Sequence, residues 1–256
     1  MASIEIADFA PEGVTLTPAT APDFDSRAAA ILGAGAPPAL ELKPYLAIVR
    51  NQNPRTVVAY TVAWTATVRN GTTRVKYTQF KFPDAVAGTS NGLSLLEGRE
   101  IGAGAERLIG LGFEIWPPEH ADSYRNYGLA EAFDLGSVIR LHIALDAVIF
   151  DDGSLLGPDR FLLAQHFIEF VRAKQSAYRD IVVALESDGL GEDALAPFRA
   201  IVRTPPAALP SDPFAIYPHL AAQEVLGFHR RVLLEVFRRT LRRRPFTIRR
   251  LSETSD

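Results

Sequence analysis

The run at residues 56–68 constrains the fold of this chain more than any other feature. In TVVAYTVAWTATV, apolar side chains alternate with small or polar ones without interruption from Val58 to Val68. A period of two in β-branched and aromatic residues is typical of a strand with one face in a core. Asn70-Gly71 follows directly, and both residues tolerate the positive φ angles of a type I′ turn. The run therefore predicts a long strand, a tight type I′ hairpin and a partner strand.

Other segments with the same period predict further strands. RVKYTQFKF at 74–82 is the expected partner strand, with a bulge between Tyr77 and Phe80 where its alternation changes phase. Strands are also expected over 43–50, 106–116 and 138–150, and Ile4 and Ile6 indicate an edge strand in an otherwise irregular N-terminal arm. Because turns and no helices separate these strands, an antiparallel sandwich is predicted instead of a parallel sheet.

After Asp151-Asp152-Gly153 the period becomes helical. Pro158 and Asp159 suit the first turn of a helix, and apolar residues at helical spacing continue from Leu163 to Leu185, before Ser187-Asp188-Gly189. A short helix is expected around 191–202, and a final helix from about 214 to 244, ended by Pro245.

The predicted fold class is α+β, an antiparallel immunoglobulin-like β-sandwich followed by two long C-terminal helices. The predicted organisation is an N-terminal arm at 1–41, the sandwich at 42–155 and a helical region at 156–256. The helical region is expected to pack on the sandwich, because each helix carries an apolar stripe that needs a partner.

Two segments carry a resemblance to known proteins. PYLAIVRNQNPRTVVAYTVAWTATVRNG at 44–71 resembles the paired strands of immunoglobulin-like sandwiches. IFDDGSLLGPDRF at 149–161, followed by a helix, resembles a junction in uncharacterised bacterial proteins. The resemblance covers roughly residues 42–187 and implies a fold without implying an activity. The chain has no cysteine, so the disulfide of antibody domains is absent.

Composition excludes several classes of chemistry. Without cysteine there are no disulfides, thiolate nucleophiles, iron–sulfur clusters or cysteine-ligated zinc. No apolar run is long enough to span a bilayer. The N-terminus MASIEIADFAPEGV lacks the basic and apolar regions of a signal peptide, which favours a cytoplasmic location. Arginine far outnumbers lysine and alanine is abundant, a habit of GC-rich bacterial genomes.

Charge is distributed unevenly along the chain. Residues 1–229 carry a net charge of −9 and residues 230–256 a net charge of +6, within a total of −3. An arginine-rich helix of this kind can hold a polyanion such as nucleic acid, or an anionic surface, and its alternative role is a solvated helix face. The candidate anion-binding residues are Arg231, Arg238, Arg239, Arg242 and Arg243.

The segment GTSNG at 88–92 matches the G-x-S-x-G pattern that presents a nucleophilic serine in many hydrolases. A nucleophile elbow needs a buried parallel strand before the serine and a helix after it. The alternating QFKFPDAVA with Pro83 and the glycines at 98, 102 and 104 supply neither. We therefore interpret Ser90 as part of a turn, and a serine hydrolase using Ser90 stays as an alternative function.

Histidines and carboxylates give weaker signals. His142 and Asp146 share a strand face but lie about 13 Å apart along it, and His166 with Glu169 supplies only two of the ligands a metal needs. The acidic loop 151–159 resembles a calcium loop in composition but not in spacing. No metal site, catalytic residue or cofactor is predicted.

The sequence favours a non-catalytic bacterial binding or structural module of unknown ligand. The expected partners are a protein or a polyanion at the C-terminal helix. The first alternative is a binder of nucleic acid or anionic surfaces through the arginine-rich helix, and the second is the hydrolase.

Overall fold

The computed structural model places two compact units, each with a buried hydrophobic cluster of its own. Unit 1 contains residues 1–81, 100–163 and 249–256, and unit 2 contains residues 82–99 and 164–248. The structure describes residues 3–32, 43–82, 100–110, 113–114, 137–188, 193–203, 214–227, 241 and 246–251.

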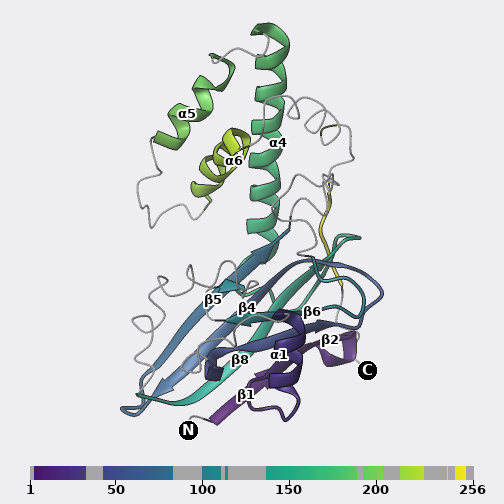
Figure 1. Ribbon diagram of the computed structural model, residues 1–256, viewed down its shortest axis with the longest axis vertical. Helices are drawn as coiled ribbons and strands as arrows, with labels where there is room; N and C mark the ends of the chain where they lie inside the picture. The colour runs from purple at the N-terminus through teal and green to yellow at the C-terminus, as the bar shows by residue number, and fades with distance from the viewer. Residues whose placement is uncertain are drawn as a thin grey trace. The chain divides into compact units, whose positions relative to one another are not determined.

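Unit 1 is built around a mixed sheet, called sheet A, with the strand order β10-β9-β8-β4-β5 (Figure 1). Its long strands β4, β5 and β8 are antiparallel neighbours, while β1 runs parallel to β8 and β10 runs parallel to β9. Strand bounds are β1 Ser3–Ala7, β4 Val57–Val68, β5 Thr73–Lys81, β8 Val138–Phe150, β9 Ser154–Leu156 and β10 Arg249–Arg250.

A second, antiparallel sheet of unit 1, called sheet B, has the order β2-β3-β6-β7. These strands are β2 Val14–Pro18, β3 Ala47–Asn51, β6 Glu106–Gly110 and β7 Phe113–Glu114. Helix α1 (Phe24–Leu32) packs on this sheet, since Phe24 and Ala28 share a buried cluster with Ile48 of β3 and Leu108 of β6. Short 3-10 turns occupy Ala10–Glu12 and Lys43–Tyr45.

Strand β4 explains why the long alternating run dominates the sequence. It lies between β5 and β8 and is buried on both faces over most of its length. One face carries the large side chains Tyr60, Val62 and Trp64, all completely buried, and the other carries small ones such as Ala59 and Thr61. Large residues on one face of β4 fill the core. Small residues on the other face leave room for the chain segments that pack against that face.

The register between β4 and β8 contains irregularities that the sequence does not reveal. Thr61 pairs with Ala147 while its neighbour Val62 pairs with Leu145, so Asp146 is an extra residue in β8. This bulge interrupts the alternation along β8. A second irregularity lies at the start of β8, where Thr67 pairs with Arg140 and Val68 with Val138, so Ile139 is skipped in the pairing and its side chain is 48% exposed.

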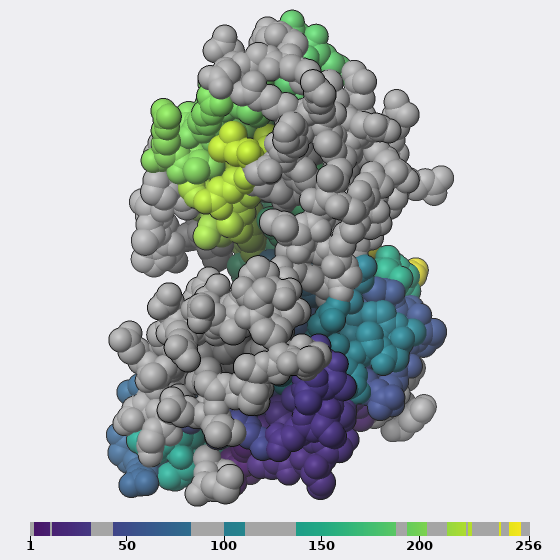
Figure 2. Space-filling view, in the orientation of Figure 1, coloured from purple at the N-terminus to yellow at the C-terminus, as the bar shows by residue number. Residues whose placement is uncertain are grey.

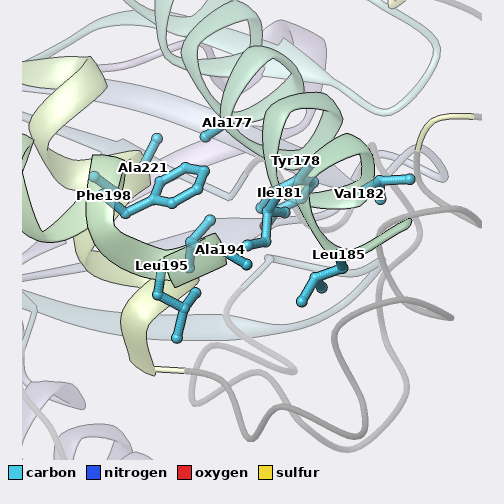
Figure 3. Packing of buried hydrophobic residues seen from close by; sticks show 11 residues of the cluster. Ala177, Tyr178, Ile181, Val182, Leu185, Ala194, Leu195, Phe198 and Ala221 are labelled. Carbon is cyan, nitrogen blue, oxygen red and sulfur yellow. The ribbon is translucent and has the colours of Figure 1, made fainter. Parts of the chain in front are cut away.

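Unit 2 consists, in its described part, of helices α4 (Leu163–Asp188), α5 (Ala196–Arg203) and α6 (Ile216–Gly227), with a 3-10 turn at Asp193–Leu195. Tyr178 and Ile181 of α4 face Phe198 of α5 in the hydrophobic cluster of this unit (Figure 3). Ala221, Ala222 and Val225 of α6 complete it. No helix within the described ranges is both long and apolar enough to cross a membrane.

The α+β class is confirmed, but the purely antiparallel arrangement is wrong. The two parallel pairs involve terminal segments, β1 and β10, which join strand edges of sheet A from distant points of the chain. Alternation in a sequence predicts a strand but carries no information on the direction of its neighbour. The finer assignment to an immunoglobulin-like sandwich stays a prediction, as does packing of the helical region on it.

Three element predictions need correction. The edge strand at Ile4 and Ile6 is confirmed as β1, but the rest of the N-terminal arm is not irregular, because it contains β2 and α1. The strand expected over 106–116 is two short strands, β6 and β7, that pair with each other. Helix α4 begins at Leu163, not at Pro158, because residues 158–162 form a turn with positive φ at Asp159 and Leu162.

The described helices also differ in number from the two predicted long ones. Four α-helices occur in the described residues, α1 among them, and only α4 is long, with 26 residues. Helix α4 ends at Asp188, as predicted, and the short helix expected around 191–202 is α5. Helix α6 covers the start of the predicted final helix, whose residues 228–240 lie outside the described part.

Candidate functional site

Strand β5, at one end of sheet A, is exposed over more than half of its length. Its residues Thr73–Tyr77 are all exposed, although they pair along their whole length with β4. Atoms of this part of the chain, blue in the colour scale, reach the surface at the lower left of Figure 2. We call the hairpin loop and this strand, residues 69–79, the basic edge.

The hairpin that opens the basic edge has a different turn from the predicted one. The amide of Gly71 donates to the Val68 carbonyl at 2.8 Å, and the Val68 amide donates to Thr72 at 3.0 Å. Gly71 has a φ of +82°, but Asn70 does not have a positive φ, which excludes type I′. The loop is therefore a three-residue turn ending in a glycine bulge. Its Asn70 side chain accepts the Thr72 amide at 2.9 Å instead.

The predicted bulge between Tyr77 and Phe80 is absent, since β4 and β5 pair in continuous register from Thr67–Thr73 to Ala59–Lys81. The change of phase has another cause. Phe80 lies on the face of Tyr60, on which its ring stacks at 4.6 Å, and Tyr77 lies on the opposite face, opposite Ala63. The aromatic residues of β5 thus serve two different faces.

Tyr77 is held in place by a distant segment of the chain. Its ring stacks on Phe161 with centroids 4.3 Å apart, and Gln79 donates to the Phe161 carbonyl at 2.7 Å. Tyr77 nevertheless remains 47% exposed, and its neighbour on the same face, Val75, is 51% exposed. These side chains form a small, rigidly backed apolar surface beside the strand edge.

The segment that carries Phe161 is fixed by the bulge residue Asp146. Its carboxylate accepts the Phe161 amide at 3.2 Å, and its carbonyl accepts the Asp159 amide at 3.4 Å. Burial raises the pKa of Asp146, against the hydrogen bonds and the charge of Arg160, which lower it. Gly157 has a φ of +96°, and a side chain there would collide with the Asp146 carbonyl. Asp146 is therefore a structural carboxylate that positions the backing of Tyr77.

Positive charge lies near this apolar surface, in the hairpin loop and on the other face of β5. Arg69, Arg74 and Lys76 are exposed, and none of the three side chains has an ion-pair or hydrogen-bond partner within the described part of the chain. No acidic residue occurs anywhere in residues 57–82. Arg140 on the neighbouring β8 differs, because it pairs with Glu5 at 3.2 Å. The basic edge thus carries three cations without an ionic partner among the described residues, on a protein whose net charge is −3.

Lys81 ends β5 in a different environment. Burial lowers the pKa of its ammonium group to about 8. Its Nζ donates to the Gln79 side chain at 3.2 Å. Lys81 is consequently a covered amine at the inner end of the strand and not part of the exposed cationic surface.

A second polar cluster lies toward the edge of sheet A that is opposite β5, where the acidic loop 151–153 joins β8 to β9. Ser154, completely buried, donates its amide at 2.9 Å and its hydroxyl to the Asp152 carboxylate, and accepts Arg55 at 2.6 Å. Arg55 also lies 4.1 Å from the centroid of the Phe150 ring. Arg249 of β10 is 3.8 Å from Asp152. These contacts fasten strand ends together.

Asp152 is ionised more readily than an ordinary aspartate. Burial on its own would raise the pKa of Asp152. The hydrogen bonds from Ser154 and the charges of Arg55 and Arg249 lower this pKa, and together they outweigh the effect of burial. Its pKa therefore lies below the usual value. The loop that resembled a calcium site in composition uses its carboxylate on protein cations.

The other predicted pairs have structural partners. His166 is buried, and its Nδ1 lies 2.6 Å from the Tyr217 hydroxyl. Glu169 instead pairs with Arg172 at 2.7 Å. His142 pairs across the strands with Thr65 and Glu5, apart from the bulge at Asp146. In the described ranges no three His, Asp or Glu residues are grouped so that they could hold a metal ion.

Several candidate residues lie outside the described residues. These are Ser90 of the hydrolase alternative and the whole predicted anion-binding set, Arg231, Arg238, Arg239, Arg242 and Arg243. Sequence reasoning overlooked the basic edge, although one signal was available. An acid-free run of 26 residues with four cations stands out in a chain that is acidic overall.

Comparisons with protein-family models, with curated proteins and with solved structures each found no match to this chain.

Proposed function

We propose that the protein acts by binding, as a non-catalytic β-sandwich module that takes an acidic polypeptide at its basic edge. The observation that carries this proposal is the combination on the basic edge of exposed Val75 and Tyr77 with Arg69, Arg74 and Lys76, cations that have no ionic partner among the described residues. Apolar surface beside free charge is typical of a protein-binding surface.

The order of strands in sheet A supports an immunoglobulin-like sandwich. The succession β9-β8-β4-β5, with hairpins joining β8 to β9 and β4 to β5, corresponds to the G-F-C-C′ sheet of variable-type domains. Sheet B departs from that pattern. In the A-B-E-D sheet of immunoglobulin domains the strand beside B comes later in the chain than the outer strand. In sheet B, β6 lies beside β3 and comes earlier in the chain than the outer strand β7. We therefore place unit 1 among sandwiches of this general kind and give it a connectivity of its own.

Electrostatics favour an acidic partner. The protein as a whole has a pI near 6.0, so an anion is not attracted by its net charge. Any such attraction must come from a local field, and exposed charges act mainly within about 10 Å at ordinary ionic strength. Three cations on one hairpin, unpaired within the described ranges, supply such a field. The exposed Val75 and Tyr77 between them fit a polypeptide better than a phosphate backbone, which needs cations alone.

The test is binding of fluorescent poly-L-glutamate to the whole protein, with duplex DNA as a competing polyanion. We expect binding that weakens steeply with salt and falls about tenfold in the double variant Arg74→Glu, Lys76→Glu, because each reversal turns an attraction into a repulsion. The matched control is Arg179→Glu with Arg203→Glu, which changes the net charge equally at exposed arginines of unit 2.

Equal losses in both double variants, or no binding at about 50 mM salt, where screening is weak, would contradict the proposal. Tighter binding of DNA than of poly-L-glutamate would replace the acidic polypeptide by a nucleic acid as the partner.

A further inference from the structure

The geometry of β5 points to a specific mode of binding. We infer that the partner adds to sheet A as an extra β-strand along the free edge of β5, and that it alternates acidic and apolar residues. This inference rests on the proposed function and specifies the partner of the same surface. Strand addition to an exposed sheet edge joins main-chain hydrogen bonds with side-chain selection at alternate positions.

The backbone of β5 has hydrogen-bonding groups that point away from β4. Val68 and Thr72 form a hydrogen-bonded pair, since the Val68 amide donates to Thr72 at 3.0 Å. Hydrogen-bonded pairs alternate along an antiparallel ladder, so Arg74, Lys76 and Thr78 direct their amides toward β4 in the observed register. The amides and carbonyls of Thr73, Val75 and Tyr77 consequently face outward.

The outward groups are open to a partner. No backbone hydrogen bond outside the β4–β5 ladder joins Thr73, Val75 or Tyr77 to another described residue, and β5 is the terminal strand of sheet A. All five residues from Thr73 to Tyr77 are exposed, whichever face of the sheet their side chains lie on. An incoming strand would therefore satisfy outward donors and acceptors that bond to no other described residue.

The side chains of β5 determine the pattern of the partner. Val75 and Tyr77 lie on one face of the strand, and Arg74 and Lys76 lie on the other. Residues directly opposite each other in a ladder have their side chains on the same face and interact. A strand that places apolar residues opposite Val75 and Tyr77 must therefore offer acidic residues opposite the cations.

A second copy of β5 is a poor occupant of this edge. Antiparallel self-pairing centred on Val75 would set Arg74 opposite Lys76 of the other copy, at both ends of the pair. Like charges directly opposite are destabilising in a ladder. Cations on an exposed edge strand are also a common protection against self-association. Charge repulsion therefore disfavours pairing of β5 with a second copy of itself, and charge attraction favours pairing with an acidic strand.

The first experiment uses the peptide Val-Glu-Val-Glu-Val-Glu-Val with the whole protein, measured by fluorescence anisotropy. Its control is a peptide of the same composition with the glutamates in one block. Two further peptides carry N-methyl groups either on the central valines or on the central glutamates. Only one set of amides faces β5 in an added strand: the valines if it is antiparallel and the glutamates if it is parallel.

We expect the alternating peptide to bind at least about tenfold more tightly than the block isomer, and N-methylation of one set only to weaken it about tenfold. Equal effects of the two methylated sets, or no preference for the alternating peptide, would overturn strand addition.

The second experiment changes the protein. Val75→Pro removes an outward amide and leaves the ladder to β4 intact, and proline is tolerated on edge strands in that position. We expect this variant to lose the alternating peptide at least about tenfold while keeping poly-L-glutamate, whose attraction depends on charge. Val75→Thr keeps the amide and is the matched control. An unchanged melting temperature of Val75→Pro establishes that its fold survives.

The outcomes separate the two proposals. Retention of the peptide by Val75→Pro overturns strand addition and leaves the proposed function standing. Failure of the wild-type protein to bind either the peptide or poly-L-glutamate overturns both. A dimer of the wild-type protein in light scattering that Val75→Pro abolishes would assign the edge to a second copy and overturn the acidic partner.

Discussion

At the scale of single residues, buried polar groups in unit 1 mostly hold backbone segments in place. Asp146 fixes the turn that carries Phe161, and Ser154 links Arg55 to Asp152. By contrast, Arg74 and Lys76 hold nothing in the described residues. Charged groups that hold the fold together are thus distinct from charged groups that could contact a partner.

The Asp152 cluster predicts loss of stability in acid. Because the folded-state pKa of Asp152 is lowered, its contribution is present above the unfolded value of 3.8 and is lost as pH falls through the lower folded value. Ser154→Ala removes its hydroxyl bonds and is expected to cost about 1–3 kcal/mol at neutral pH. Urea unfolding between neutral pH and pH values below 4 measures both effects.

The control for this variant is Ser187→Ala, whose exposed hydroxyl bonds only within α4. It should change the free energy of unfolding by less than about 0.5 kcal/mol. A cost for Ser154→Ala as small as that, or a cost that grows in acid, would contradict the assignment.

Lys81 predicts a pH dependence of opposite sense. Its pKa is lowered to about 8 in the fold against 10.5 in the unfolded chain, so the unfolded state binds more protons between these values. Stability contributed by this group therefore rises as pH increases from about 8 to 10.5. Lys81→Met should be more stable than the wild type at pH 7, with a difference that shrinks toward pH 10.5, in urea unfolding at several pH values.

A constant difference between Lys81→Met and the wild type across that range would show that the amine is not buried in its charged state. Lys76→Met, at an exposed position of the same strand, is the matched control.

At the scale of elements, the hairpin turn determines where β5 begins and therefore which of its amides face outward. Gly71 has a φ of +82° and no atom near its missing side chain, so conformation alone opposes a substitution there. Gly71→Ala should lower the free energy of unfolding by about 1–2 kcal/mol. Gly102→Ala, equally free of neighbours but without a positive φ, should be nearly neutral. Equal effects of the two substitutions in thermal unfolding would contradict the turn.

Local periodicity predicts those elements whose sequence pattern is long and regular. β4 and α4 were found because their alternation or helical spacing persists over many residues. The sequence could not show that Tyr77 stacks on Phe161, since that contact joins residues far apart in the chain. For the same reason the phase change in β5 resembles a bulge in the sequence, although its register with β4 is continuous. The direction of β1 and β10 likewise depends on which strand edge is free.

The candidate site was missed for a related reason. Whether a strand is central or terminal is a property of the sheet, and Val75 looks like a core residue in the sequence although it is 51% exposed. The arginines at 231–243 give a stronger signal in the sequence, because five of them fall within 13 residues. The hairpin carries only three cations, fewer than the five arginines, but none of the three side chains has an ionic partner among the described residues.

At the scale of the whole molecule, the protein combines an acidic average with a local basic edge. Its net charge of −3 disfavours general attraction of anions, so binding at β5 has to be specific in position. Free edge strands promote unwanted pairing, and the cations on β5 oppose pairing with its own kind. The same charges select an acidic strand.

The most direct measurement is a map of backbone amide chemical shifts in the deuterated whole protein as the alternating valine–glutamate peptide is added. The account predicts that the largest changes lie in residues 69–79, and that the outward amides of Thr73, Val75 and Tyr77 become protected from hydrogen exchange. Changes centred on residues 228–244, or an edge whose amides stay unprotected at saturation, would contradict it.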